Sequence, residues 1–176
     1  MIRIGQDIEI RTATPADNFL LAELGARTYA DTFAAENTAE NMAAYLAEAF
    51  SPEHQAAELA DAGTLFLIAE KDGQPVGYAR LKEGLPPNCV RGAHPMEIVR
   101  LYSIREMIGH GMGAALMTAC LNEARRRTCD VIWLDVWEKN PRAIAFYEKW
   151  GFVKVGEQGY QLGDDLQNDW LMARNL

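Results

Sequence analysis

Three glycines at alternate positions, Gly109, Gly111 and Gly113, lie between residues 96–103, which are typical of a β-strand, and residues 114–128, which are typical of a helix. The first amide groups of a helix lack partners and carry partial positive charge, so they can bind a pyrophosphate. Glycine also permits the left-handed dihedral angles that direct several amides toward one anion. The sequence therefore indicates a phosphate-binding loop. A tight turn that only requires small residues is the simpler alternative.

The same loop also fits a dinucleotide-binding pattern. Residues 109–114 satisfy G-x-G-x-x-A, and Asp135 follows at about the spacing of a ribose-binding acid. Two features count against this alternative. The first glycine lies several residues beyond the end of its strand, and the unit occurs late in the chain, after a predicted hairpin. We therefore favour a phosphate-binding loop over a dinucleotide-binding site.

A second candidate for chemistry is the helix that follows Asn140. Asn140 is a favourable N-cap and Pro141 suits the first helical position, whereas Gly151 is typical of a helix end. The helical spacing places several side chains on one face, namely Ala143, Phe146, Tyr147 and Trp150. On spacing alone, Asn140 is a cap and Tyr147 is part of a packed face.

The elements that position these residues alternate between helix and strand. Capping residues predict helix starts at Thr14, Thr38 and Ser51. The Asp72-Gly73 step predicts a hairpin between two of the strands. Strands are predicted at 8–11, 64–70, 76–81, 96–103, 131–137, 152–155 and 169–174. A hairpin and a crossover in one chain favour an α/β (α+β) mixed sheet over an all-parallel one.

Composition restricts the class of protein. The 176 residues suit a single domain spanning 1–176, and the formal net charge of -8 argues against a nucleic-acid partner. The apolar runs are too short for a membrane span, and residues 1–7 do not resemble a signal peptide. Three cysteines without ligand spacing favour the cytoplasm. The scattered histidines His54, His94 and His110 predict no metal site.

The two candidate motifs together resemble the GCN5-related N-acetyltransferase (GNAT) family. The resemblance is carried by Gly109-x-Gly111-x-Gly113 and by Asn140-x-x-Ala143-x-x-Phe146-Tyr147-x-x-x-Gly151-Phe152. Residues 29–52 further resemble the PaiA-type spermidine/spermine acetyltransferases. The resemblance implies an acyl-CoA N-acyltransferase fold, with a central, mostly antiparallel sheet of splayed strands flanked by helices. It also implies acetyl-CoA as the co-substrate.

The same resemblance implies roles for individual residues. Tyr147 would be the general acid toward the leaving thiolate, because a phenol with a pKa of about 10 is protonated at pH 7. Asn140 would hydrogen-bond the pantetheine arm or its phosphate end. The other cofactor-binding residues would be Leu101, Tyr102, Ser103, Ile108, Gly109, His110, Gly111, Met112, Gly113 and Ala114. Ile108 departs from the family, which usually has Gln or Arg there, so His110 or Arg105 would have to compensate.

The expected reaction is direct transfer of an acetyl group to a primary amine. The amine must lose a proton before it attacks, and we predict that Glu97 is the base, although an ordinary edge carboxylate or a partner of Arg100 is the alternative. The expected acceptor is a small amine such as a polyamine. The alternatives are a non-catalytic acyl-CoA-binding regulatory module and an acetyltransferase of peptide or protein amines. The sequence leaves the oligomeric state open, with a homodimer as one alternative.

Overall fold

The computed structural model describes residues 2–3, 8–163 and 165–176. The prediction about a signal peptide concerns residues 1–7, most of which lie outside this range. The chain divides into two units, one formed by 1–81 and 100–120 and the other by 82–99 and 121–176. We call them the first and the second unit. The chain passes between them near the end of strand β4 (Gln74–Glu83), within strand β5 (Pro95–Ser103) and within helix α4 (Met112–Arg126).

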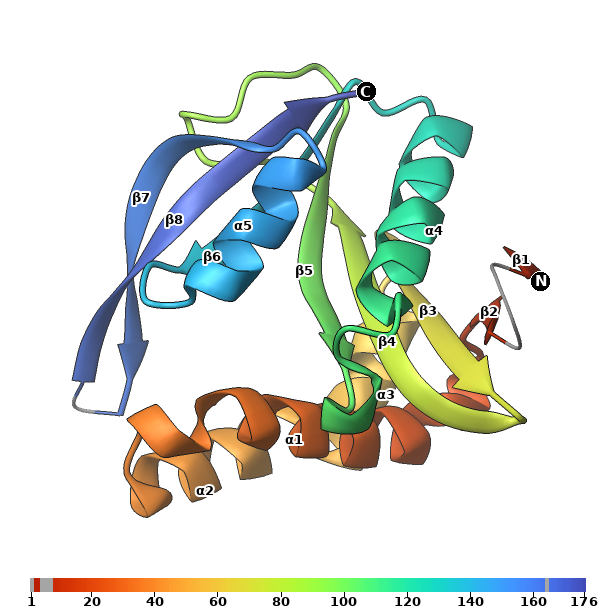
Figure 1. The fold of residues 1–176 in the computed structure, drawn as a ribbon, viewed down its shortest axis with the longest axis vertical. Coiled ribbons are helices and arrows are strands. Elements are labelled where there is room, and N and C mark those ends of the chain that lie inside the picture. Colours follow the sequence, from red (N-terminus) through yellow and green to blue (C-terminus); the bar gives the residue numbers. More distant parts are fainter. Residues whose placement is uncertain (1, 4–7, 164) are drawn as a thin grey trace. The chain divides into compact units, whose positions relative to one another are not determined.

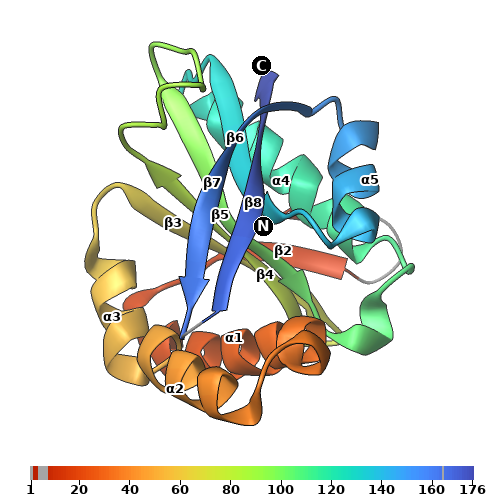
Figure 2. The same ribbon diagram turned by 90° about the vertical axis from the view of Figure 1, so that its left-hand side faces the viewer.

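The first unit contains helices and antiparallel strands. Its strand order is β1-β2-β3-β4-β5, with β1 and β2 antiparallel and β2 and β3 antiparallel. The three main helices lie beside one another (Figure 2), since α3 contacts both α1 and α2. The elements before β5 are β1 (Ile2–Arg3), β2 (Ile8–Thr12), α1 (Asn18–Phe33), α2 (Ala39–Ala49), α3 (Pro52–Ala60), β3 (Thr64–Lys71) and β4 (Gln74–Glu83). Short 3-10 turns also occur at Pro15–Asp17, Ala34–Glu36 and Arg105–Met107.

Local sequence signals account for the boundaries of these elements. The hydroxyls of Thr38 and Ser51 accept the predicted capping bonds, at 3.2 and 3.1 Å. Asp72 and Gly73 both adopt positive φ, 51° and 73°, as the predicted Asp-Gly hairpin requires. The start at Thr14 needs a correction, because the first turn is a 3-10 turn and α1 begins only at Asn18.

The core of the first unit joins α1 to the β3–β4 hairpin. Leu21 and Leu24 of α1 pack against Phe66, Ile68 and Tyr78 of the hairpin, and all five are almost fully buried. This packing follows from the helical spacing of the leucines and the apolar runs of the two strands. It fixes α1 against the part of the sheet that leads into β5.

The second unit is a sheet with the order β5-β6-β8-β7 and one helix, α5 (Pro141–Lys149). Strand β6 (Val131–Trp137) is parallel to β5 and antiparallel to β8 (Asp165–Asn175), which pairs in turn with β7 (Val153–Leu162). In Figure 1, β7 and β8 form a long hairpin, and α5 lies alongside them. The core gathers Val90, Val131, Trp133, Leu171 and Ala173.

The last two strands are longer than the sequence predicted. The prediction placed strands only at 152–155 and 169–174, but β7 continues to Leu162 and β8 begins at Asp165. The extra residues are mostly polar or glycine, so hydrophobic alternation does not reveal them. Backbone pairing with the opposite strand holds them instead, with an irregularity in the register between Lys154 and Gly156.

The architecture is a mixed α/β one, and antiparallel strands predominate, as predicted. The parallel pairing of β5 with β6 covers Pro95, Met96 and Glu97, and no further pairs of these two strands occur in the described part of the chain. Such a short ladder is what splayed strands would give. Of the helices in the described ranges, none is long and apolar enough to cross a membrane.

Candidate active site

The predicted site residues fall into two sets. The residues predicted to contact the pantetheine arm and the pyrophosphate, 101–103 and 108–114, lie in the first unit. Glu97, Asn140 and Tyr147 lie in the second unit. The first set lies at the end of β5, in the loop after it and at the start of α4, whereas the second lies on β5 and on α5 with its N-cap.

The glycine loop of the first unit joins the end of β5 to α4. Ala115 is the first residue of α4 whose amide donates to a backbone carbonyl in the described part of the chain, that of Gly111 at 3.0 Å. The amides of the residues before it therefore lie at a helix N-terminus, where intrahelical partners are missing. Two other loop amides already donate within the loop, Ile108 to the Arg105 carbonyl and His110 to the Met107 carbonyl, each at 3.2 Å.

The structure shows why two of the three glycines are needed. Gly109 and Gly111 have φ of 81° and 84°, in the left-handed region that other residues avoid. A Cβ at either position would meet no other atom within 4 Å, so dihedral preference and not crowding selects glycine there. Gly113 lies inside α4 and has no such requirement. The loop thus turns twice in the left-handed sense before the helix begins.

The two basic side chains of this loop are engaged with their own unit. His110 Nδ1 lies 3.1 Å from the carbonyl oxygen of Ile108. Arg105 donates through Nη2 to the carbonyl of Asp31 at 3.2 Å, although its side chain is largely exposed. The predicted compensation for Ile108 by one of these side chains would require it to leave the observed contact.

Aromatic contacts and a close backbone approach fix the end of β5. The ring of Tyr102 lies 6.3 Å from that of Tyr29, 6.5 Å from that of Phe33 and 6.1 Å from that of Tyr78. A Cβ on Gly77 of β4 would come within 2.8 Å of the Tyr102 carbonyl oxygen. Glycine at position 77 therefore lets β4 approach the segment predicted to bind the thioester, a role that the sequence did not reveal.

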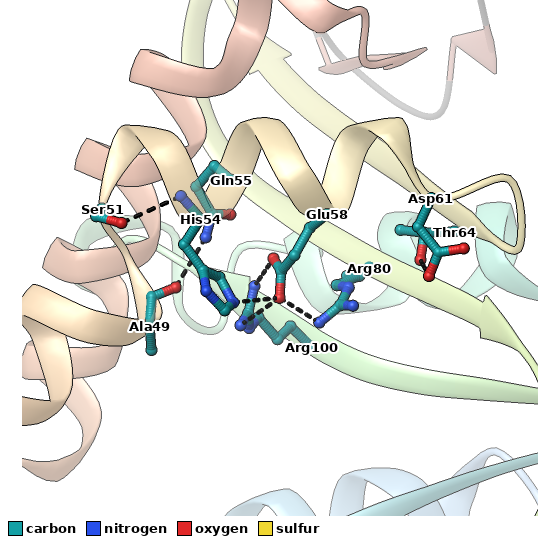
Figure 3. Close-up of polar contacts among 9 residues, drawn as sticks. All are labelled: Ala49, Ser51, His54, Gln55, Glu58, Asp61, Thr64, Arg80 and Arg100. Carbon is teal, nitrogen blue, oxygen red and sulfur yellow. Dashed lines mark hydrogen bonds and ion pairs between the residues drawn. The ribbon is translucent and has the colours of Figure 1, made fainter.

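A buried ionic cluster lies just before this segment (Figure 3). Glu58 of α3 accepts from Arg80 Nη1 at 2.5 Å, and from Arg100 Nη1 and Nη2 at 2.7 and 3.1 Å. His54 Nε2, one turn earlier on α3, lies 3.1 Å from the same carboxylate. The Glu58 side chain is only 9% exposed, whereas that of His54 is 44% exposed. We call these four residues the Glu58 cluster.

The Glu58 cluster ties three elements of the first unit together. It links α3 to the middle of β4 through Arg80 and to β5 through Arg100, which directly precedes Leu101. Arg100 also lies 4.9 Å above the ring of Phe50. Burial raises the pKa of Tyr78, a fully buried neighbour of this cluster. The cluster thus positions the end of β5, and its ionic partners are too far apart in sequence for any local pattern to predict.

In the second unit, α5 carries Asn140 and Tyr147 as the sequence predicted. Asn140 Oδ1 accepts from the Ala143 amide at 3.1 Å, so the predicted N-cap is confirmed. The helix ends in a Schellman motif, in which the Phe152 amide donates to the Tyr147 carbonyl and the Gly151 amide to the Glu148 carbonyl. Gly151 has φ of 82°, which this motif requires.

Tyr147 is held firmly between other aromatic side chains. It is 9% exposed, and its ring lies 5.4 Å from that of Phe146 and 5.9 Å from that of Phe152. The cap at Asn140 uses the amide oxygen, which leaves the Nδ2 group to serve as a donor toward a ligand. The helix therefore presents one polar group at its start and one phenol near its end, both on a fixed backbone.

Strand register places three carboxylates on one face of the second unit. Glu97 is opposite Trp133, Asp135 is opposite Leu171, and Trp137 is opposite Asp169. Because partners in register share a face and side chains alternate along a strand, all three carboxylates point to the same side. We call this side the carboxylate face; it is formed by Glu97, Asp135 and Asp169. Arg174 of β8 is opposite Ile132, so its side chain points to the other face of the sheet. There it donates a hydrogen bond to the carbonyl of Trp150, which follows α5.

Two acids of the carboxylate face are electrostatically unusual. Burial, together with the nearby charges of Asp135 and Glu138, raises the pKa of Asp169 to about 6. Burial also raises the pKa of Asp135, which accepts a hydrogen bond from Gln158 Nε2 at 3.3 Å. Asp169 was not among the predicted site residues, although it begins the predicted strand 169–174, because no local pattern shows that it lies beside Asp135. Within the described ranges, no group of three His, Cys, Asp or Glu side chains is placed to hold a metal ion.

Comparison with known proteins gives the family. A model of the acetyltransferase (GNAT) family matches residues 22–152. The chain is 32% identical over 149 residues to an uncharacterized N-acetyltransferase of Lactobacillus delbrueckii subsp. lactis, and the match covers 85% of this chain and 86% of that protein. The chain therefore belongs to the GNAT family, and it is an N-acetyltransferase. The predicted family and enzyme class are confirmed, and the family match goes against the dinucleotide alternative.

Solved structures agree with the fold. The PaiA N-acetyltransferase from Thermoplasma acidophilum in complex with coenzyme A has a TM-score of 0.78 and 23% identity, covering 97% of this chain and 100% of that one. The ribosomal-protein-alanine N-acetyltransferase from Brucella melitensis has a TM-score of 0.69 and 26% identity, covering 96% and 99%. The predicted GNAT fold is thereby confirmed.

Proposed function

We propose that this enzyme transfers the acetyl group of acetyl-CoA to a small primary amine, with a polyamine as the favoured acceptor. The observation that carries the proposal is the glycine loop at the start of α4, with Gly109 and Gly111 in left-handed conformations. Such a loop suits a pyrophosphate, which is the group that coenzyme A would bring to it. The PaiA structure named above contains coenzyme A, which supports the same donor.

The loop would bind the pyrophosphate mainly through backbone amides. The amides of Ile108 and His110 already have carbonyl partners, so the available donors are those of Gly109 and of the first helical turn, residues 111–114. Leu101, Tyr102 and Ser103 would pair with the pantetheine arm through the backbone at the end of β5. Asn140 would donate to the same arm through Nδ2.

The chemical step requires a base and an acid. The neutral amine nitrogen attacks the thioester carbonyl carbon and forms the new C–N bond, and the C–S bond then breaks. Glu97 would take the proton lost by the amine nitrogen, and Tyr147 would give its phenolic proton to the departing thiolate. A phenol is protonated at neutral pH, so it starts in the state that this role requires.

The acidic character of the chain supports a cationic acceptor. A formal net charge of -8 concentrates small cations near the surface. A second candidate acceptor is the terminal amine of a peptide or protein, and it is favoured by the similarity to the ribosomal-protein-alanine N-acetyltransferase from Brucella melitensis. Of the two acceptors, we propose the small amine.

The test is thiol release from acetyl-CoA by the purified enzyme in the presence of different amines. Spermidine, a monoamine, an amino acid and a short peptide would be compared with a blank that contains no amine. Release that depends on a small amine supports the proposal. Release with the peptide alone would replace the small amine by the second candidate, and release independent of any amine would contradict both.

A further inference from the structure

Asp169 is an acidic residue of β8 that is largely buried. It is 8% exposed, and within the described part of the chain its carboxylate takes part in no hydrogen bond or ion pair. The charged groups that act on it are themselves acids, Asp135 and Glu138. A buried carboxylate normally has a cationic or hydrogen-bonding partner, because burial without one is costly. The side chain is therefore arranged as if to receive a positive group.

The neighbours of Asp169 define which positive group would fit. Asp135 of β6 lies diagonally across from Asp169 of β8. Gln158 of β7 is directly opposite Asp169, and its side chain reaches across β8 to donate a hydrogen bond to Asp135. The two carboxylates are thus adjacent on the same face. On β6, the other neighbour of β8, Trp137 is directly opposite Asp169. Two carboxylates beside an indole favour an organic ammonium ion, which can pair with the acids and contact the aromatic ring.

From these contacts we propose that Asp135 and Asp169 bind an ammonium group of the acceptor other than the one that is acetylated. The inference rests on the proposed function. The reacting nitrogen must be neutral to attack, whereas two adjacent carboxylates stabilise the protonated amine. The pair therefore suits the non-reacting end of a diamine or a longer polyamine. The enzyme would prefer acceptors with two amines over monoamines of the same length.

The first test needs no variant. Thiol release from acetyl-CoA would be measured with n-butylamine and with putrescine, which differ only by the second amine. A charge-assisted contact at the second amine predicts a kcat/KM for putrescine about 10- to 100-fold higher, mainly through a lower KM. Equal kcat/KM for the two amines would overturn the ammonium site and leave the transferase in place. If neither amine, nor any other, is acetylated, the proposed function fails and the inference fails with it.

The second test assigns the preference to the carboxylates. In Asp169→Asn the ratio of kcat/KM for putrescine to that for butylamine should fall to about one, because the amide keeps the shape but not the charge. Asp165→Asn removes the same charge from an exposed position on β8 and should leave the ratio unchanged. Asp135→Asn should lower the ratio like Asp169→Asn and provides the answer if the latter does not fold. An unchanged ratio in a folded Asp169→Asn or Asp135→Asn enzyme would contradict the proposal.

Discussion

Replacing Glu58 with glutamine should destabilise the protein more than the same substitution at an exposed position does. The carboxylate accepts from Arg80 at 2.5 Å and from Arg100 at 2.7 and 3.1 Å, and its side chain is 9% exposed. Glutamine has nearly the same shape but leaves two buried guanidinium groups facing a neutral amide. Removing one partner from a buried ionic cluster costs about 3–5 kcal/mol. A domain of this size typically has about 5–15 kcal/mol of stability in total, so the variant should fold but be marginal.

The assay is equilibrium unfolding by urea, together with the thermal midpoint. At about 2–4 °C per kcal/mol for a chain of this length, the melting temperature of Glu58→Gln should fall by about 10 °C. The matched control is Glu53→Gln, which lies on the same helix but is exposed in its first turn. A surface change of this kind should alter stability by about 0.5 kcal/mol or less. If Glu58→Gln is no less stable than Glu53→Gln, the cluster does not hold α3, β4 and β5 together.

Three further predictions concern the catalytic residues and the stability of the first unit. Tyr147→Phe keeps the ring packing but removes the acid, so kcat should fall about 10²-fold in steady-state assays, and an unchanged kcat would discard the role. Gly111→Val should raise the KM for acetyl-CoA, because valine disfavours the φ of 84°; an unaltered KM would mean that the loop does not bind the cofactor. The hydrogen bonds from Arg11 lower the pKa of Asp17 to about 2, so its contribution to stability is present above the unfolded pKa of about 3.9 and is lost as the pH falls through 2. By urea unfolding, Asp17→Asn should therefore be less stable than the wild type by about 1 kcal/mol at pH 7, and this difference should shrink as the pH falls toward 2 and vanish below it. A difference independent of pH would contradict the pairing.

The features that the sequence predicted best are those fixed by a few adjacent residues. The hairpin at Asp72-Gly73 and the helix caps at Thr38, Ser51 and Asn140 depend on local dihedral angles and local hydrogen bonds. The composition of these short segments is enough to specify them. The family motifs belong to the same category, since both coincide with a helix start.

The features that the sequence did not predict depend on long-range contacts. Glu58 meets its arginines 22 and 42 residues away, and no periodic pattern marks such partners. The pairing of β6 with β8 places Asp169 beside Asp135, and the sequence does not show which strands pair or in which register. Gly77 is explained only by the approach of β4 to Tyr102. The roles assigned to Tyr147, Glu97 and the glycine loop stay predictions.

The most direct test of the central claim is the identity of the product. The purified enzyme would be incubated with acetyl-CoA and putrescine, and the amine would be analysed by mass spectrometry while free thiol is measured in parallel. Direct transfer predicts that acetylated putrescine forms in an amount equal to the thiol released. Thiol release without an acetylated amine, or no consumption of acetyl-CoA with any amine, would contradict the account.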